Sequence, residues 1–309
     1  MYKVFIDGSA GTTGLRIYGR LSEREDIELL TLPDNLRKDA SARAEKLNSA
    51  DIVFLCLPDD AAREAVAMLE NPSVKVIDTS TAHRTASDWE YGFPELSGRL
   101  EKIAASKRIA NPGCHASGFI ALIEPLVGAG ILNAGAQLSC FSITGYTGGG
   151  KKMIDDYEGG RPALYDAPRQ YGLPQSHKHL PEMQKICKLE HAPAFCPVVA
   201  PYPCGMEVTV PLFADDIIGS AEDIKEVYRS VYNNGVVKFV SDDENGFLSA
   251  NAYSGSDSMG VSVYGNEERI LLVSRFDNLG KGASGAAIQN MNILLGKEQT
   301  KGLVLQEKL

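Results

Sequence analysis

Residues 3–14 read KVFIDGSAGTTG, an apolar run that leads directly into three spaced glycines. The apolar run predicts a strand, and the helical spacing of apolar residues after it predicts a helix. Glycines at such a strand-to-helix turn let the backbone bend sharply and approach a pyrophosphate, which binds the free N–H groups at the helix start. The stretch therefore predicts a dinucleotide-binding turn, with a tight turn in an unrelated α/β sheet as the alternative. The candidate cofactor contacts in it are Gly8, Ser9, Gly11, Thr12, Thr13 and Gly14.

The first third of the chain repeats this alternation of strand and helix. Apolar runs that predict strands lie at Lys3–Ile6, Ile27–Leu32, Asp51–Leu57, Val74–Asp78 and Arg108–Ala110. Segments with helical spacing lie between them, at Thr13–Arg24, Ala40–Ser49 and Asp60–Leu69. This order predicts a parallel sheet that is covered by helices on both faces.

Beyond about residue 116, strands follow one another without regular helices between them. A long helical stretch, Ala116–Gly128, comes first. Strands are then predicted at Gln137–Thr144, Phe195–Ala200, Met206–Phe213, Val236–Val240 and Arg269–Phe276, and an amphipathic helix at Ala221–Tyr232. Such an order predicts an antiparallel or mixed sheet in a second, α+β domain. A terminal helix over Gly280–Gly296 is expected to return to the first domain.

Composition excludes several classes of function. The 309 residues are 44% hydrophobic and 23% charged, as in globular proteins, so neither disorder nor a fibrous architecture is indicated. The formal charge is -9 and no Lys/Arg-rich block occurs, so we expect neither a nucleic-acid partner nor binding to an acidic membrane. The N-terminus has no signal-type pattern, and no apolar run approaches the roughly 20 residues of a membrane helix. Six scattered cysteines without a CxxC pair favour free thiols and a cytoplasmic location.

The end of the second predicted strand bears on the choice between NAD and NADP. NAD sites usually place an Asp or Glu there, which binds the ribose 2′-OH. Here residues 30–33 read LTLP, and Arg37 and Lys38 follow. The missing carboxylate and the two nearby cations favour NADP; the alternative is that these side chains are ordinary solvated charges.

Cys114 is the strongest candidate for a nucleophile. The segment IANPGCHASG, residues 109–118, ends a predicted strand and opens a predicted helix, with Pro112 and Gly113 at the bend. A thiol at a helix N-terminus lies at the positive end of the helix dipole, which favours the reactive thiolate. The alternative is a buried, inert thiol. We expect that state for Cys56, Cys140 and Cys196.

A nucleophilic cysteine usually needs a partner that transfers protons. His115 is adjacent in sequence, but we expect its side chain to point away as the helix begins. His177 and His179 lie just before a predicted helix start and are the better candidates. A metal site that joins this pair to Cys187 and His191 is the alternative, but the spacing matches no common zinc pattern, so we expect no metal.

A second glycine-rich segment, GYTGGGKK at 145–152, nearly spells a phosphate-binding P-loop. The hydroxyl that would bind Mg²⁺ is missing, because Lys152 occupies its position, so a nucleoside triphosphatase is not favoured. We expect a flexible loop that closes over the substrate and places Lys151 or Lys152 on a phosphate. A surface turn with solvated lysines is the alternative.

Together these motifs resemble a known family. The matching segments are GSAGTTG (8–14), DTSTAHR (78–84), NPGCHASG (111–118), HKHLPEM (177–183), GMEVTVPL (205–212) and DNLGKGASGAAIQNMN (277–292). Over nearly the whole chain they resemble N-acetyl-gamma-glutamyl-phosphate reductase of arginine biosynthesis, in its short form. The related aspartate-semialdehyde dehydrogenases share the architecture and the cysteine but differ around the histidine motif.

The resemblance implies an α/β fold with two domains. Residues 1–115 plus about 280–309 would form a Rossmann-type NADP-binding domain, and about 116–279 an α+β catalytic and dimerisation domain. The second domain would carry the contacts of a homodimer or homotetramer.

The resemblance also implies a mechanism and its residues. Cys114 would attack a small acyl-phosphate substrate, and the resulting thioester would accept a hydride from NADPH to release the semialdehyde. His179, or His177 in its place, would act as acid and base. The implied substrate or phosphate contacts are Ser80, Arg84 and Asn111. The implied cofactor contacts on the returning helix are Gly282, Ala283 and Asn290.

Other functions stay open at this point. A reductase with the same mechanism would act on aspartyl or aminoadipyl phosphate. A nucleotide-binding regulator would have kept the fold and lost catalysis, but it would need neither Cys114 nor the histidine pair. A cysteine hydrolase would not need the glycine turn.

Overall fold

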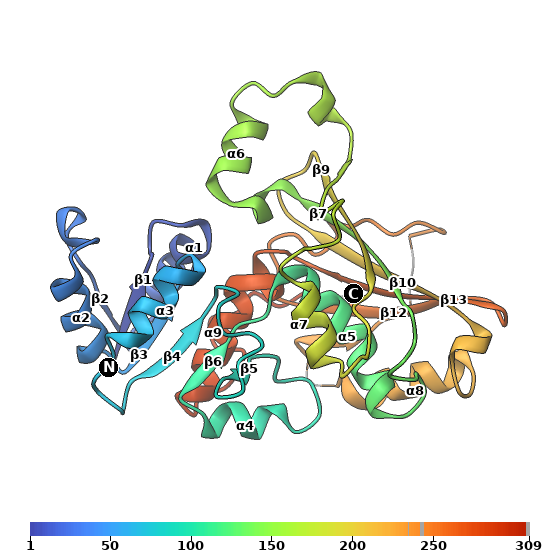
Figure 1. The fold of residues 1–309 in the computed structure, drawn as a ribbon, viewed down its shortest axis with the longest axis horizontal. Coiled ribbons are helices and arrows are strands. Elements are labelled where there is room, and N and C mark those ends of the chain that lie inside the picture. The colour runs from blue at the N-terminus through green and yellow to red at the C-terminus, as the bar shows by residue number, and fades with distance from the viewer. Residues whose placement is uncertain (234, 242–243, 307–309) are drawn as a thin grey trace. The chain divides into compact units, whose positions relative to one another are not determined.

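The computed structural model describes residues 1–233, 235–241 and 244–306 and divides the chain into two compact units (Figure 1). Unit 1 comprises Met1–Pro94, Gly98–Pro112 and Ala283–Leu303. Unit 2 comprises Glu95–Ser97, Gly113–Gly282 and the described residues from Val304 onward. No helix within the described ranges is both long enough and apolar enough to span a bilayer.

The core of unit 1 is a six-stranded sheet in which every pairing is parallel. Its strand order is β2-β1-β3-β4-β6-β5. The strands are β1 Tyr2–Asp7, β2 Ile27–Leu30, β3 Ile52–Leu55, β4 Lys75–Asp78, β5 Glu90–Tyr91 and β6 Arg108–Ala110. The five strands predicted from apolar runs are confirmed; β5 was not predicted because two residues give no readable pattern.

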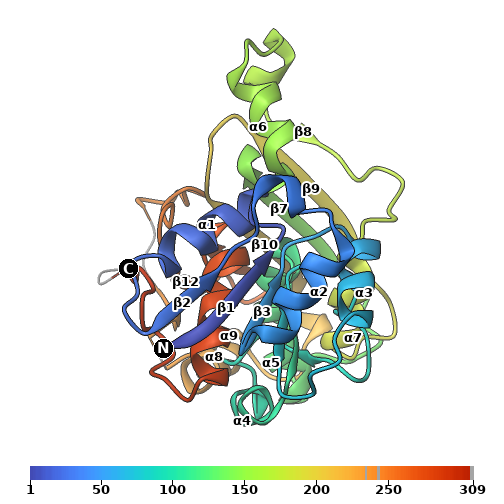
Figure 2. The ribbon, with the colours of Figure 1, turned by 90° about the vertical axis from the view of Figure 1, so that its left-hand side faces the viewer.

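Helices cover both faces of this sheet, as predicted. They are α1 Thr12–Leu21, α2 Ala40–Ser49, α3 Asp59–Ala67, α4 Arg99–Ala105 and α9 Gly285–Leu294. Alternate residues of each strand point to opposite faces, so Val4 and Ile6 pack with α1, α4 and α9, whereas Phe5 packs with α2 and α3. Figure 2 shows these two groups of helices around β1 and β3. The predicted return of the C-terminal helix to the first sheet is confirmed by α9.

Unit 2 contains a seven-stranded mixed sheet with the order β11-β12-β13-β10-β7-β9-β8. Its strands are β7 Ser139–Gly145, β8 Arg169–Gln170, β9 Ala194–Ala200, β10 Met206–Phe213, β11 Val237–Phe239, β12 Met259–Gly265 and β13 Arg269–Phe276. The pairs β7–β9 and β11–β12 are parallel and the others antiparallel, which confirms the predicted mixed sheet. The strand β12 was not predicted.

The helices of unit 2 are α5 Cys114–Gly128, α6 Gly150–Glu158, α7 Leu180–Ile186 and α8 Ala221–Val231. Helix α5 is buried over most of its length and packs against β10 and β13. At Gly118 the approach is so close that a Cβ atom would lie 2.4 Å from Val208 and 2.8 Å from Ser274. A helix that is apolar on nearly all sides thus forms the core of this unit.

The expectation of a flexible loop at 145–152 is wrong. A 3₁₀ turn, Tyr146–Gly149, leads into α6, and Lys151 and Lys152 lie exposed in the first turn of that helix. Gly150 has a φ of 74°, in the left-handed region. Tyr157 on α6 stacks on Tyr146, with ring centroids 4.8 Å apart. Aromatic packing that the glycine pattern did not reveal therefore orders the segment.

Candidate functional site

The glycine turn of unit 1 has the geometry that close backbone approach requires. Gly8 has a φ of 89°, and a Cβ atom there would lie 2.2 Å from the carbonyl oxygen of Cys56. A Cβ atom at Gly14 would lie 2.5 Å from the carbonyl oxygen of Gly8. Gly11 is the N-cap of α1. Only glycine fits at positions 8 and 14 without moving the backbone, so these two residues keep the turn tight.

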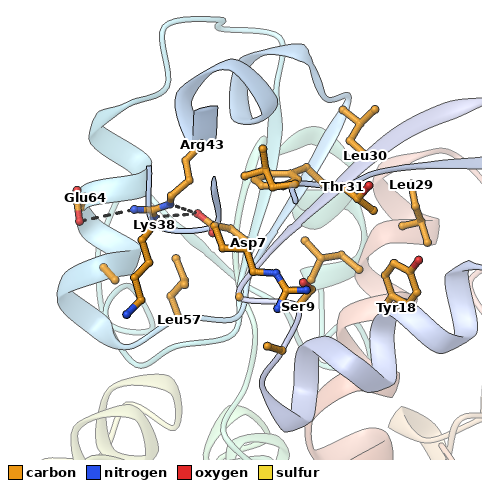
Figure 3. A pocket seen from close by; sticks show the side chains of 17 residues that line it. Asp7, Ser9, Tyr18, Leu29, Leu30, Thr31, Lys38, Arg43, Leu57 and Glu64 are labelled. Carbon is orange, nitrogen blue, oxygen red and sulfur yellow. Dashed lines mark hydrogen bonds and ion pairs between the residues drawn. The ribbon is translucent and has the colours of Figure 1, made fainter. Parts of the chain in front are cut away.

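A cavity of about 510 Å³ opens at this turn (Figure 3). Its lining includes Asp7, Gly8, Ser9, Tyr18, Leu30, Arg37, Lys38 and Arg43. Of the predicted cofactor contacts, Gly8, Ser9 and Arg37 line it. Thr12 and Thr13 lie in the first turn of α1 instead. Arg37 pairs with exposed Asp34 at 2.8 Å, so its guanidinium remains within reach of solvent.

An ion pair in the wall of this cavity was missed from the sequence. Arg43 donates from Nη2 to Asp7 Oδ2 at 2.9 Å, and both side chains are buried. Burial raises the pKa of Asp7, and Arg43 offsets part of that rise. The available signal was the position of Arg43, four residues before Leu47 on the buried side of α2.

A polar cluster forms where β4 ends. Asp78 is fully buried, and its Oδ2 accepts a hydrogen bond from Ser80 Oγ at 2.8 Å. The same oxygen lies 2.6 Å from His83 Nδ1. Arg84 donates from Nε to the carbonyl oxygen of Asn111 at 2.9 Å and from Nη2 to that of Thr79 at 3.0 Å. The structure therefore brings together the predicted substrate residues of unit 1.

Asn111 is held from the other side by the returning segment. Its Nδ2 donates to the carbonyl oxygen of Ala283 at 3.1 Å, and Asn290 Nδ2 lies 3.2 Å from its Oδ1. Asn290 is fully buried and also donates to the carbonyl oxygen of Gly92. Neither Ala283 nor Asn290 lines the cavity of about 510 Å³; both support Asn111.

Cys114 is the first residue of α5, directly after the N-cap Gly113, as the sequence predicted. The N–H of Gly113 donates to Glu182 Oε1 at 2.8 Å, and this carboxylate on α7 is buried. A Cβ atom at Gly282 would lie 3.0 Å from Cys114 Cβ, so Gly282 lies directly against Cys114. Glu182 is a further residue that sequence reasoning missed, although it belongs to the HKHLPEM motif.

Cys114 is partly accessible, as are Cys56, Cys196 and Cys204, whereas Cys140 and Cys187 are buried. Burial raises the pKa of Cys56 to about 12. Burial also raises the pKa of Cys140 and, strongly, that of Cys187. Thiols of this kind are inert at neutral pH. Of the three cysteines expected to be buried, Cys140 is buried, whereas Cys56 and Cys196 are half-buried.

The side chain of His115, which was expected to point away as the helix begins, packs against both acid–base candidates. Its ring centroid lies 5.8 Å from that of His177 and 5.7 Å from that of His179. Its Nδ1 lies 2.6 Å from Ser142 Oγ and its Nε2 2.6 Å from the hydroxyl of Tyr171. The first turn of α5 directs this side chain into unit 2, where β7 and the segment before α7 enclose it.

The histidine pair itself is locally ordered. The ring centroids of His177 and His179 are 4.8 Å apart, and the backbone N–H of His179 donates to His177 Nδ1 at 3.2 Å. His179 is buried and His177 is half-buried. Burial raises the pKa of Tyr171, and the charge of Cys114 raises it further.

Lys151 is not part of either cluster and lies exposed on α6. Among the described residues, no three His, Cys, Asp or Glu side chains are arranged to hold a metal ion. Of the residues weighed for such a site, Cys187 is buried and His191 is exposed.

Two family models match the chain, one for each unit. The semialdehyde dehydrogenase NAD binding domain matches residues 3–105, and the semialdehyde dehydrogenase dimerisation domain matches residues 114–278. The second match indicates that the chain forms oligomers.

Relatives of known name span nearly the whole chain. N-acetyl-gamma-glutamyl-phosphate reductase 2 of Nostoc sp. is 45% identical over 318 residues, which cover 97% of this chain and 99% of the relative. N-acetyl-gamma-glutamyl-phosphate reductase of Brucella ovis is 46% identical over 307 residues, which cover 96% and 99%.

Solved structures share the fold at lower identity. Aspartate semialdehyde dehydrogenase II of Vibrio cholerae, complexed with ASA, has a TM-score of 0.71 at 18% identity and covers 96% of this chain and 98% of its own. Aspartate semialdehyde dehydrogenase of Candida albicans, solved with NADP, has a TM-score of 0.68 at 16% identity and covers 96% and 99%. The resemblance drawn from the motifs is confirmed: the chain belongs to the semialdehyde dehydrogenase family, in the group of the N-acetyl-gamma-glutamyl-phosphate reductases.

Proposed function

We propose that this chain reduces N-acetyl-γ-glutamyl phosphate to N-acetylglutamate 5-semialdehyde and phosphate with NADPH, as a step of arginine biosynthesis. The observation that carries the proposal is local. Cys114 opens α5, and the next residue, His115, contacts the rings of both His177 and His179. A nucleophilic thiol beside histidines is what acyl transfer through a thioester requires. Membership of the family and the names of the relatives supply the substrate.

The cavity of unit 1 supports NADP as the cofactor. Gly8 and Gly14 let the backbone close into a turn too tight for Cβ atoms, which is the form of turn that binds a pyrophosphate at a helix start. Arg37 and Lys38 line the cavity beyond β2 and are suited to a 2′-phosphate. When bound, the dinucleotide supplies the hydride.

Cys114 would carry the acyl group. Its place at the first residue of α5 leaves backbone N–H groups free to stabilise the thiolate and the oxyanion that forms when Sγ attacks the acyl carbon. The bond from this carbon to the phosphate oxygen breaks, and the acyl group stays on Sγ as a thioester. After the hydride has been added, a second oxyanion collapses, the C–S bond breaks, and the aldehyde and the thiolate separate.

We propose His179 as the acid and base, with His177 as the substitute. The histidine takes the thiol proton before attack and returns it when the thiolate is released. His177 Nδ1 already accepts a backbone N–H, so its neutral form carries the proton on Nε2. His179 packs its ring against His115, next to Cys114.

We propose Ser80, Arg84, Asn111 and Lys151 as substrate contacts. The first three lie together at the carboxyl edge of the sheet in unit 1, where ligands of parallel sheets bind. Lys151 has an exposed ammonium group that is suited to a phosphate. We also propose the domain boundaries 1–115 plus about 280–309 for the cofactor-binding domain, which includes Cys114, and about 116–279 for the substrate and dimerisation domain.

We propose a cytoplasmic homodimer or homotetramer. A biosynthetic reductase with free thiols suits a reducing compartment. The dimerisation-domain match covers most of unit 2 and supports assembly through that unit.

The test is phosphate-dependent reduction of NADP by the purified protein, with N-acetylglutamate semialdehyde and, separately, aspartate semialdehyde. We expect activity with the acetylated aldehyde, and a loss of roughly 10³-fold or more in Cys114→Ser. Cys196→Ser, a second half-buried thiol of unit 2, is the matched control and should stay active. Activity with aspartate semialdehyde alone would keep the thioester chemistry and reject the proposed substrate.

A further inference from the structure

The side chain of His115 is fixed at both ring nitrogens. It is 3% exposed, and Ser142 on β7 and Tyr171 after β8 each bind one nitrogen at 2.6 Å. A neutral imidazole has one donor and one acceptor, and both neighbours are hydroxyl groups, so either tautomer satisfies the pair. Two bonds on opposite sides of the ring prevent it from rotating.

Two acid–base candidates and a phenyl ring rest against this fixed ring. The interplanar angle to His177 is 81° and that to His179 is 52°, and the ring of Phe195 lies edge-on at 5.3 Å. Because His115 directly follows Cys114 in the first turn of α5, one helical turn carries both the thiol and the surface on which the histidines pack.

His115 also contributes no charge. Burial, with a smaller effect of His177, lowers its pKa to about 3, so the ring is neutral at working pH. The titratable groups nearest to it are His177 and His179 before α7, Tyr171 after β8, Glu182 on α7 and Cys114 on its own helix. The surrounding elements also carry Cys140 on β7, Cys196 on β9 and Lys185 on α7. A neutral ring in this position leaves the neighbouring histidines free to gain and lose a proton without repulsion from a third cation.

We propose that His115 is a positioning residue that holds the rings of His177 and His179 in a set orientation relative to Cys114. This role rests on the proposed function. It differs from that of a core histidine because both acid–base candidates pack on this ring, which two hydrogen bonds hold in place.

The test compares variants of His115 that keep different parts of it. His115→Phe keeps the ring and removes both hydrogen bonds, whereas His115→Gln places an amide near the position of Nε2 and can still bond Tyr171. We expect kcat of His115→Phe to fall by about 10- to 100-fold with KM changed by less than about threefold, because misplacing a proton-transfer group affects the chemical step. His115→Gln should recover part of that loss. His191→Gln, an exposed histidine, is the matched control.

A second readout does not depend on the substrate. The rate of alkylation of Cys114 by iodoacetamide, followed against pH, reports the thiolate and its histidine partner. We expect the midpoint of this profile to shift by at least about half a pH unit in His115→Phe and in the same direction in Tyr171→Phe, which keeps the His115 ring. If wild-type protein reduces neither aldehyde but the profile still shifts, the proposed function fails and the positioning role stands.

Unchanged kcat and an unchanged alkylation profile in a folded His115→Phe protein that binds NADP would overturn the proposal. If that variant does not fold, Tyr171→Phe decides, because it removes only one hydroxyl. A wild-type profile in Tyr171→Phe and in Ser142→Ala would then reject the role.

Discussion

Two buried carboxylates, Asp7 and Glu182, act through the groups that they bind. Asp7 accepts two hydrogen bonds from Arg43 in the wall of the unit 1 cavity, and Glu182 accepts the N–H of the residue before Cys114. A buried charge is stable only when it is paired or hydrogen-bonded. Each carboxylate therefore contributes both to the stability of the fold and to the geometry of a candidate functional site.

Arg43→Met should destabilise the protein strongly. It leaves the Asp7 carboxylate buried and unpaired, which costs about 3–5 kcal/mol of unfolding free energy at pH 7. The double variant Arg43→Met/Asp7→Asn should recover most of that loss. Urea unfolding measures both, with Arg63→Met as the control, because Arg63 pairs with Asp60 at the surface. A loss in Arg43→Met no larger than that of the control would contradict the expectation.

The loss in Arg43→Met should also shrink as pH falls. The folded pKa of Asp7 is raised above its usual value of 3.8, so stability is highest below that value and is lost as pH rises through the folded pKa. Arg43 lowers the pKa of Asp7, so the variant that lacks Arg43 has an Asp7 pKa that is raised further. The difference between wild type and variant should therefore be largest near neutrality and smallest below about pH 4. A difference that is constant between pH 4 and 8 would indicate lost packing instead.

Glu182→Ala should lower stability more than Glu182→Gln. Alanine removes the acceptor of the Gly113 N–H, and a buried donor without its acceptor costs about 1–3 kcal/mol. Glutamine keeps an oxygen at that position and should lose less than half as much. Equal losses of unfolding free energy in the two variants would show that the carboxylate charge, and not the hydrogen bond, is what matters.

At the scale of elements, α5 depends on its small residues. Gly118 lets the helix approach β10 and β13 closely, while Gly128 at the end of the same helix faces open space. The two glycines offer a matched comparison within one helix. Helix α6 shows the opposite dependence, because large aromatic side chains order it.

Gly118→Ala should destabilise unit 2 and Gly128→Ala should not. A Cβ atom at Gly118 overlaps Val208, and overpacking of a core costs about 1–3 kcal/mol. At Gly128 the added methyl group meets nothing, and the better helix propensity of alanine should leave stability unchanged or raise it by up to about 1 kcal/mol. Thermal unfolding of the two variants distinguishes them, and similar melting temperatures would contradict the packing argument.

At the scale of the whole molecule, one face of the unit 2 sheet is unusually apolar. Phe141 is 50% exposed and Leu271 is 41% exposed. Their partners across the ladder, Thr209 and Pro211, are two residues apart on β10, so both side chains lie on the same face. Exposed apolar side chains on a sheet face are typical of assembly surfaces.

The protein should therefore have the mass of two or four chains in solution, and Phe141→Lys should weaken that assembly. Light scattering after size-exclusion chromatography measures the mass over a range of protein concentrations. Leu15→Lys, at an exposed apolar position in unit 1, is the control and should leave the mass unchanged. A wild-type monomer at all concentrations would contradict oligomerisation, and an unaffected Phe141→Lys would place the contacts elsewhere.

Much of the fold could be predicted because its cues are local. The five main strands of unit 1, the glycine turn at Gly8 and the place of Cys114 at a helix start follow from hydrophobic spacing and backbone geometry. The strand β5 could not be predicted because it has only two residues. Helix α6 could not be predicted because aromatic contacts between residues distant in sequence order it.

The sequence by itself determined the alternation of elements, the place of Cys114 at a helix start and the family, because each is encoded in neighbouring residues. Only the tertiary structure decided the environment of His115, whose hydrogen-bond partners lie 27 and 56 residues away, and the pairing of Asp7 with Arg43. It also decided that Glu95 belongs to unit 2, where Lys281 binds it at 2.7 Å across 186 residues. The physical reason is common to all three: a buried polar group must find its partner in space, and the pattern of nearby residues does not reveal where the folded chain brings that partner.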